Sequence, residues 1–181
     1  MKVLGITGWS GSGKTTLLAD LIPLLVAQGL RVSTIKHAHH DFDVDQAGKD
    51  SYRHRAAGAS EVLISSARRF ALMRELRGEP EPGLAELLAR LTPVDLVLVE
   101  GFKREAHPKI EVWRADTGKP MLQPDDPQII AVASDAPIDG LTVPLLDAGD
   151  VAGIAAFIRR WLADGDAAAA AATGARRGAA E

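Results

Sequence analysis

The sequence predicts an α/β fold, in which a mostly parallel β-sheet carries helices on both faces. Short apolar stretches rich in valine and isoleucine alternate with longer leucine-rich stretches, separated by glycine and polar residues. The short stretches have the composition of buried strands, and the long ones have the composition of helices. Crossovers of about a dozen residues or more allow neighbouring strands to run parallel.

Taken in order, the apolar stretches define alternating elements. Strands are expected at residues 2–7, 31–36, 61–66, 68–76, 94–99, 109–114, 128–134 and 142–146, and helices at residues 15–28, 48–57, 84–91 and 151–162. The first helix is closed by Gly29 as a C-cap, and Pro23 within it is expected to kink it or loosen one turn. Gly58 stops the second helix, and prolines mark residues 78–83 as a loop.

One domain is expected over residues 1–163, because a chain of this size can bury a single hydrophobic core. Residues 164–181 are rich in alanine and have no face of leucine or valine that could dock on that core. They are therefore predicted to form a disordered tail, to which no function is assigned.

Composition excludes several classes of function. The absence of cysteine excludes disulfides, thiolate metal sites and cysteine nucleophiles, and the net charge of -3 argues against a protein that grips nucleic acid. No apolar run reaches the ~18 residues of a membrane helix. Because the chain begins directly with a predicted strand, we expect no signal peptide and a cytoplasmic location.

The most specific motif is the phosphate-binding pattern G-x-x-x-x-G-K-[ST], which lies between the first strand and the first helix. The expected nucleotide-binding residues are Gly8, Trp9, Ser10, Gly11, Ser12, Gly13, Lys14, Thr15 and Thr16. Glycines let backbone N–H groups turn inward around an anion, and the helix N-terminus adds its positive end. Lys14 is expected to neutralise the β- and γ-phosphates as a catalytic residue, and the Thr15 hydroxyl to bind Mg²⁺. The motif predicts a P-loop NTPase fold.

Glu100 ends the most hydrophobic predicted strand and is the expected acidic partner of this site. A carboxylate at the carboxyl end of a parallel strand faces the ligand crevice. We therefore predict that Glu100 is a catalytic residue and a second Mg²⁺ ligand, although many P-loop proteins carry aspartate there. A solvated charge at a strand end is the alternative.

Three further polar segments form a predicted second-substrate or partner loop. It comprises Lys36, His37, His39, His40, Asp41, Asp45, Lys49, Asp50, Ser51, Arg53 and Lys103. The histidine-aspartate stretch could instead bind zinc or nickel, or be a solvated turn, although its spacing matches no closed tetrahedral pattern. Asp50 and Ser51 could also be simple helix caps.

The base of the nucleotide is left open by the motifs. No N-K-x-D guanine-reading motif is present, and Trp9 rather than lysine follows the first glycine of the phosphate loop. The second observation argues against the dimeric ATPases that use such a lysine across their interface.

Together these segments resemble the MobB family of molybdopterin-guanine dinucleotide biosynthesis adaptor proteins. The resemblance extends to about Leu162 and is carried by GWSGSGKTTLL, TIKHAHHDFDVDQAGKDSYRHRAAGA, RRFALM, LVLVEGFK and IIAVASDAP. The phosphate loop alone is widespread, whereas the histidine-aspartate segment and VEGFK are far more specific.

The resemblance implies a Mg²⁺-dependent, homodimeric GTP-binding protein with weak GTPase activity. Its implied partner is the guanylyltransferase that joins GMP to molybdopterin, and molybdopterin is a further candidate. Two alternatives remain open from the residues: a small-molecule kinase and a GTP-dependent metallochaperone that uses His37, His39 and His40. Against the kinase, no arginine-rich lid is recognisable.

Overall fold

The computed structural model describes residues 1–38 and 42–177 of the chain, which forms two compact units. The first unit combines Met1–His37 with Leu91–Glu181, and the second is Ala38–Arg90. The sequence predicted one domain over residues 1–163, and the structure divides that stretch in two. The physical reason lies in the second unit, where few described apolar side chains are buried.

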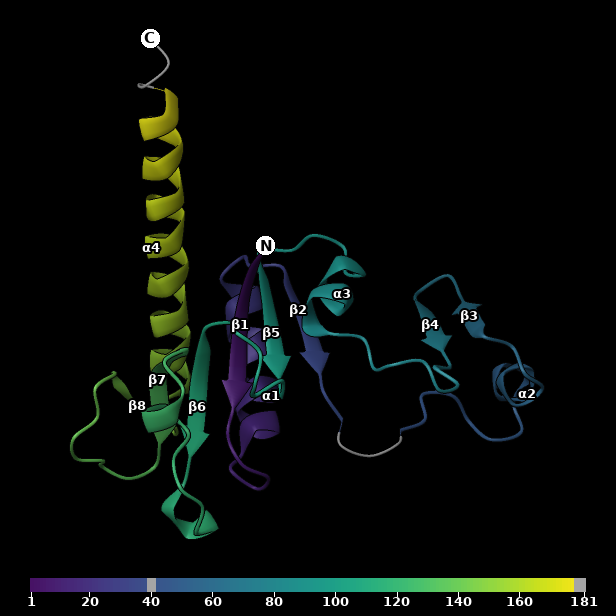
Figure 1. Ribbon diagram of the computed structural model, residues 1–181, viewed down its shortest axis with the longest axis horizontal. Coiled ribbons are helices and arrows are strands. Elements are labelled where there is room, and N and C mark those ends of the chain that lie inside the picture. Colours follow the sequence, from purple (N-terminus) through teal and green to yellow (C-terminus); the bar gives the residue numbers. More distant parts are fainter. Residues whose placement is uncertain (39–41, 178–181) are drawn as a thin grey trace. The chain divides into compact units, whose positions relative to one another are not determined.

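A six-stranded parallel sheet forms the centre of the first unit, which confirms the predicted fold class (Figure 1). Its strand order is β2-β5-β1-β6-β7-β8, and every pairing is parallel. The strands are β1 (Lys2–Thr7), β2 (Val32–Lys36), β5 (Leu96–Glu100), β6 (Lys109–Trp113), β7 (Ile129–Ser134) and β8 (Leu145–Asp147). The loops that follow these strands therefore meet at one edge of the sheet.

Two helices, α1 (Lys14–Ala27) and α4 (Val151–Arg177), pack on one face of this sheet. Side chains alternate along a strand, so Leu4 and Ile6 of β1 point to the same face, where both are fully buried. They join Leu21 of α1 and Ile158 of α4 in a single apolar core. Each such side chain stabilises the fold by about 1.5–3 kcal/mol, so this core holds the start of α1 firmly behind the phosphate loop.

The opposite face of β1 and β6 is polar although it is buried. Lys109 is 1% exposed, and its ammonium lies 3.0 Å from the Asp126 carboxylate. Glu111 is fully buried and accepts hydrogen bonds from the backbone N–H groups of Leu122 and Gln123 at 2.7 and 2.8 Å. Burial raises the pKa of the Glu111 carboxyl. These contacts attach the segment around residues 122–126 to the sheet.

His107 lies against β1 at this face, and its ring leaves room only for a glycine at position 5. A Cβ added to Gly5 would lie 2.6 Å from His107 Nε2, so no larger residue fits there. Burial, followed by the positive charge of Lys109, lowers the pKa of His107. The imidazole is therefore held in its neutral form at neutral pH.

The second unit contains α2 (Asp50–Ala56), an antiparallel hairpin of β3 (Glu61–Ser65) and β4 (Phe70–Arg74), and α3 (Leu84–Ala89). Within its described residues, the buried apolar side chains are Val62 and Leu84. The unit thus depends on backbone pairing and ion pairs more than on a hydrophobic core.

The eight predicted strands and four predicted helices all exist, with shifted boundaries. β8 begins at Leu145 rather than at residue 142, and α2 begins at Asp50 because Lys49 has an extended backbone. α1 runs without a break through Pro23. α4 continues past the predicted end at Leu162, since alanine has the highest helix propensity. Within the described residues, no helix has the length and apolar character to cross a membrane.

Candidate nucleotide site

The phosphate loop connects β1 to α1 and takes its shape from three glycines with positive φ. Gly8, Gly11 and Gly13 have φ angles of 133°, 84° and 95°, a region that favours glycine. Gly8 also has no room for a side chain, because an added Cβ would lie 2.3 Å from the Val112 carbonyl oxygen. With this backbone the loop can bring N–H groups close to an anion.

Lys14 opens α1 and reaches back over the loop. Its ammonium donates a hydrogen bond to the Trp9 carbonyl oxygen at 2.6 Å. Burial, followed by the nearby charge of Lys103, lowers the pKa of Lys14. A bound anion would favour the charged form of Lys14. The ammonium could then leave the Trp9 carbonyl oxygen and donate to phosphate oxygens instead.

Trp9 is held on two sides. The Lys103 ammonium lies 4.2 Å from the centre of its ring, and the indole N–H donates to the Pro120 carbonyl oxygen at 2.7 Å. Burial lowers the pKa of Lys103 as well. Two lysines thus converge at the loop, which gives it a positive potential suited to phosphates.

Thr15 and Glu100 meet at the end of β5, although 85 residues separate them in the sequence. The Thr15 hydroxyl donates to Glu100 Oε1 at 2.8 Å, and the Lys36 ammonium lies 3.2 Å from the same oxygen. A hydroxyl and a carboxylate are the hard oxygen donors that Mg²⁺ prefers beside nucleotide phosphates. The donor set fits the predicted magnesium site, and Lys36 adds a cation to its edge.

The rest of the predicted loop presents a mixed surface. Ser10, Gly11, Thr15 and Thr16 are exposed, whereas Ser12 is 1% exposed. The Ser12 hydroxyl has no hydrogen-bond partner among the described residues, nor has the buried Thr7 hydroxyl at the end of β1. Buried polar groups without partners are uncommon, and two of them at this loop favour a polar ligand or bound water there.

His37, which directly follows β2, lies beside Glu100 at the end of β5. The backbone N–H of His37 donates to the Glu100 carbonyl oxygen at 2.8 Å, and its ring lies 4.8 Å from that of Phe102. Gly101 has a φ of 100°, and a Cβ there would lie 2.8 Å from His37 Cβ. Phe102 has a positive φ of 48°, an uncommon conformation that marks this turn as strained.

His39, His40 and Asp41, which were predicted in the partner loop, lie outside the described residues. Across the rest of the chain, residues 1–38 and 42–177, no group of three His, Asp or Glu side chains could hold a metal ion. The predicted alternative of a histidine metal site therefore gains no support from the part of the chain that the structure describes.

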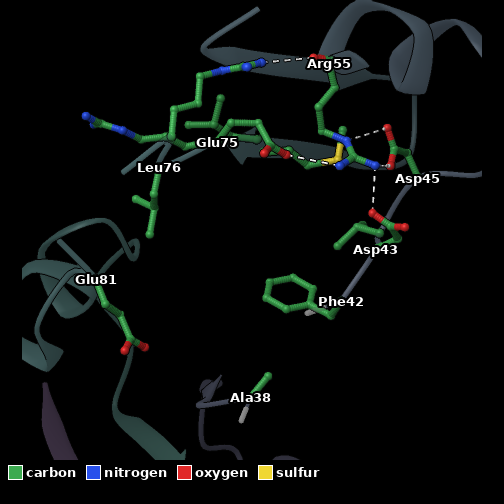
Figure 2. A pocket seen from close by; sticks show the side chains of 13 residues that line it. Ala38, Phe42, Asp43, Asp45, Arg55, Glu75, Leu76 and Glu81 are labelled. Carbon is green, nitrogen blue, oxygen red and sulfur yellow. Dashed lines mark hydrogen bonds and ion pairs between the residues drawn. The ribbon is translucent and has the colours of Figure 1, made fainter. Parts of the chain in front are cut away.

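Asp45 belongs to a charge cluster inside the second unit (Figure 2). The Arg55 guanidinium contacts Asp43 at 2.7 Å, Asp45 at 2.8 Å and Glu75 at 3.1 Å, and these partners raise its pKa. The cluster lines a cavity of about 880 Å³ that Phe42 also borders. Asp45 thus has a structural partner that sequence reasoning did not identify.

The other predicted residues of this unit lie at the beginning of α2 and within it. Lys49 is the N-cap, and Asp50, Ser51 and Arg53 lie inside the helix. The alternative that Asp50 and Ser51 cap the helix gains no support, because both lie within α2 and no side-chain hydrogen bond caps its N-terminus. In the described structure none of these four side chains has a hydrogen bond or ion pair, so they remain available for other contacts.

Sequence reasoning missed Arg114 and Asp135. Arg114 directly follows β6, and Asp135 directly follows β7. Both therefore lie at the edge of the sheet that carries Glu100 and the phosphate loop. The strand-end argument applied to Glu100 would have identified them, had it been extended to every predicted strand.

Comparison with known proteins places these features in one family. The family model of the molybdopterin guanine dinucleotide synthesis protein B, MobB, matches residues 3–135. The chain is 48% identical over 165 residues to the molybdopterin-guanine dinucleotide biosynthesis adapter protein of Escherichia coli, covering 90% of the chain and 94% of that protein. The adapter protein of Haemophilus influenzae is 47% identical, with 90% of both proteins covered. A crystal structure of molybdopterin-guanine biosynthesis protein B aligns with a TM-score of 0.70 and 31% identity, over 88% of this chain and 99% of that one.

Proposed function

The chain belongs to the MobB family, and we propose that it acts in molybdopterin guanine dinucleotide biosynthesis as a GTP-binding adapter. The observation that carries the nucleotide site is the meeting of the Thr15 hydroxyl and the Glu100 carboxylate at 2.8 Å beside the glycine loop. The fold brings these two residues, 85 positions apart in the sequence, together at the edge of the sheet that carries the glycine loop. Together with the converging ammonium groups of Lys14 and Lys103, the arrangement suits a triphosphate and its metal.

In this proposal each residue has a separate role. The loop N–H groups and Lys14 would bind the phosphates, and Thr15 and Glu100 would hold Mg²⁺, which would neutralise phosphate charge there. Lys36, 3.2 Å from Glu100, keeps that carboxylate oriented toward Thr15. Hydrolysis is slow, and the nucleotide-bound form is the one that engages the partner.

The proposed partner is the guanylyltransferase that converts molybdopterin to its guanine dinucleotide form, in the cytoplasm. Purified transferase would be assayed for dinucleotide formation from molybdopterin with and without this chain. We expect the chain to increase the yield when GTP and Mg²⁺ are present. An equal increase from the Lys14→Ala variant would contradict a role for the nucleotide.

Replacing Glu100 tests the metal site directly. Glu100→Gln keeps the size of the side chain and removes its charge, so we expect GTP affinity in Mg²⁺ to fall about 10- to 100-fold, the loss of one charge-assisted contact. In EDTA the substitution should change GTP affinity little, because without Mg²⁺ the carboxylate makes no favourable contact with the phosphates. Isothermal titration calorimetry in both buffers measures the difference.

Asp95→Asn is the matched control, because Asp95 lies just before the same strand, next to Arg31 at 2.8 Å. It should leave GTP affinity unchanged in both buffers. If Glu100→Gln bound Mg²⁺-GTP as tightly as the unaltered chain, the assignment of Glu100 to the metal would be wrong.

We also propose that the chain is a homodimer, with the β3–β4 hairpin at its interface. Leu63, Phe70 and Leu72 lie on one face of the hairpin and are each at least 49% exposed. An isolated two-stranded hairpin is marginally stable, and clustered exposed apolar side chains mark interaction surfaces.

Light scattering should therefore report about twice the 19.2 kDa chain mass. Phe70→Ser should shift the population toward the monomer, because it removes the most exposed aromatic side chain of the hairpin. Val26→Ser, which changes an exposed apolar residue of α1, should not. A monomeric mass for the unaltered chain at high concentration would rule the dimer out.

A further inference from the structure

Lys36 is the last residue of β2, and the fold fixes its side chain beside the proposed metal ligands. In the pairing of β2 with β5, Lys36 stands directly opposite Glu100, so the two side chains point to the same face of the sheet. Ile6 of β1 continues this row, on the face that α1 covers. The Lys36 ammonium is therefore tethered within reach of Thr15, the second residue of α1.

The Lys36 ammonium contacts both side chains that would hold Mg²⁺. It lies 3.2 Å from Glu100 Oε1 and donates to the Thr15 hydroxyl oxygen at 3.4 Å. That hydroxyl donates its own proton to the same Glu100 oxygen at 2.8 Å, so its lone pairs are left to accept from the ammonium. A magnesium ion binds through these same lone pairs, at a distance of about 2.0–2.1 Å. The two oxygens can therefore serve one cation at a time.

The two charged partners of this contact differ in their freedom to move. The Glu100 side chain is 13% exposed, whereas the Lys36 side chain is 58% exposed and belongs to β2, an edge strand of the sheet. An exposed ion pair contributes little to stability, so the flexible lysine side chain can leave at small cost. The carboxylate stays at the end of β5, where it remains available to a metal ion.

We propose that Lys36 is a tethered cation that competes with Mg²⁺ for Thr15 and Glu100 in the nucleotide site. Without the metal, its ammonium neutralises the terminal phosphate oxygens beside these two residues. In the presence of Mg²⁺, the ammonium yields the two oxygens and moves out toward solvent. The nucleotide can then bind before its metal, and Lys36 sets how tightly the nucleotide complex holds that metal. This inference deepens the proposed nucleotide site and rests on it.

Lys36→Met tests the competition, because it keeps the length of the side chain and removes its charge. Binding of the β,γ-imido analogue of GTP to the full chain would be measured by isothermal titration calorimetry, in EDTA and in saturating Mg²⁺. In EDTA the affinity should fall about tenfold or more, the loss of one charge-assisted contact to phosphate. In Mg²⁺ it should change by less than about threefold, because the ammonium has then left the site. This pattern is the reverse of that expected for Glu100→Gln.

A direct measurement of metal binding follows from thermodynamic linkage. If Lys36 strengthens nucleotide binding only without the metal, it must weaken metal binding to the nucleotide complex by the same factor. The complex of Lys36→Met with the GTP analogue should therefore bind Mn²⁺, a paramagnetic substitute for Mg²⁺, about tenfold more tightly than that of the unaltered chain. Electron paramagnetic resonance titration of free Mn²⁺ measures this affinity without any activity assay.

Two further variants separate charge from structure. Lys36→Arg keeps a cation at the same position and should retain the affinity in EDTA. Arg160→Met removes an exposed cation of α4 and should change neither measurement. An equal loss in EDTA and in Mg²⁺ would make Lys36 an ordinary phosphate ligand and overturn the inference. Unchanged affinity of Lys36→Met in both buffers, or the same loss in Lys36→Arg, would overturn it too.

The proposed nucleotide site can be judged separately in the same titrations. If the unaltered chain binds the analogue in a Lys14-dependent way and Lys36→Met matches it in both buffers, the inference fails and the nucleotide site stands. If the unaltered chain binds the analogue in neither buffer, both proposals fail.

Discussion

Lys14→Ala is expected to weaken GTP binding by at least about 100-fold. The ammonium is the charged group that reaches across the phosphate loop, where it donates to the Trp9 carbonyl oxygen at 2.6 Å. Two charge-assisted hydrogen bonds to phosphate oxygens, each worth about 1.5–3 kcal/mol, would be lost together. Isothermal titration calorimetry with GTP and Mg²⁺ measures the loss, and stimulation of dinucleotide formation should disappear with it.

The fold should tolerate this change. Burial lowers the pKa of Lys14, which means that the folded chain disfavours its charged form, so removing the charge should not destabilise the fold. We expect a melting temperature within a few degrees of the unaltered chain. Arg160→Ala, which removes an exposed cation of α4, serves as the matched control and should bind GTP normally. Tight GTP binding by Lys14→Ala would refute the site.

Asp126→Ala should produce the largest loss of stability. It leaves the Lys109 ammonium, 1% exposed, without the carboxylate that lies 3.0 Å away. Removing one partner of a buried ion pair costs about 3–5 kcal/mol of unfolding free energy. For a chain of this size that corresponds to a fall in melting temperature of roughly 6–20 °C, measurable by calorimetry or circular dichroism.

The double variant Lys109→Met with Asp126→Ala isolates the charge effect. Methionine fills the space of the lysine stem without a charge, so the double variant should recover most of the lost stability. It will not recover all of it, because Asp126 also accepts the Gln128 backbone N–H at 2.9 Å. Equal melting temperatures for the single and double variants would show that the buried ammonium is not the cause.

The fold of the first unit could be predicted because its local signals agree with its tertiary structure. β1 was predicted with its observed bounds, Lys2–Thr7, since an apolar β-branched run ends at a glycine that the loop requires. Glu100 could be placed beside Thr15 because strand ends share an edge in a parallel sheet. Both inferences depend on rules that hold for any sequence of this pattern.

Other features could not be predicted because they depend on contacts between distant residues. Arg55 pairs with Asp43, Asp45 and Glu75 because the chain folds back on itself in the second unit. The hydrophobic pattern of the sequence does not indicate this fold. Lysine is rarely buried, and nothing in the local sequence distinguishes Lys109 or indicates its ion pair with Asp126. The division into two units likewise depends on how little of the segment 38–90 is buried.

The position of β1 in the sheet has a consequence for how the protein is made. β1 pairs with β5 and β6, which begin at Leu96 and Lys109. A nascent chain therefore exposes β1 and the leucines of α1 without partners until more than half of the sequence has left the ribosome. Folding rates fall as contacts become more distant in sequence, so we expect slow, late formation of the phosphate loop and a need for protection from aggregation during synthesis.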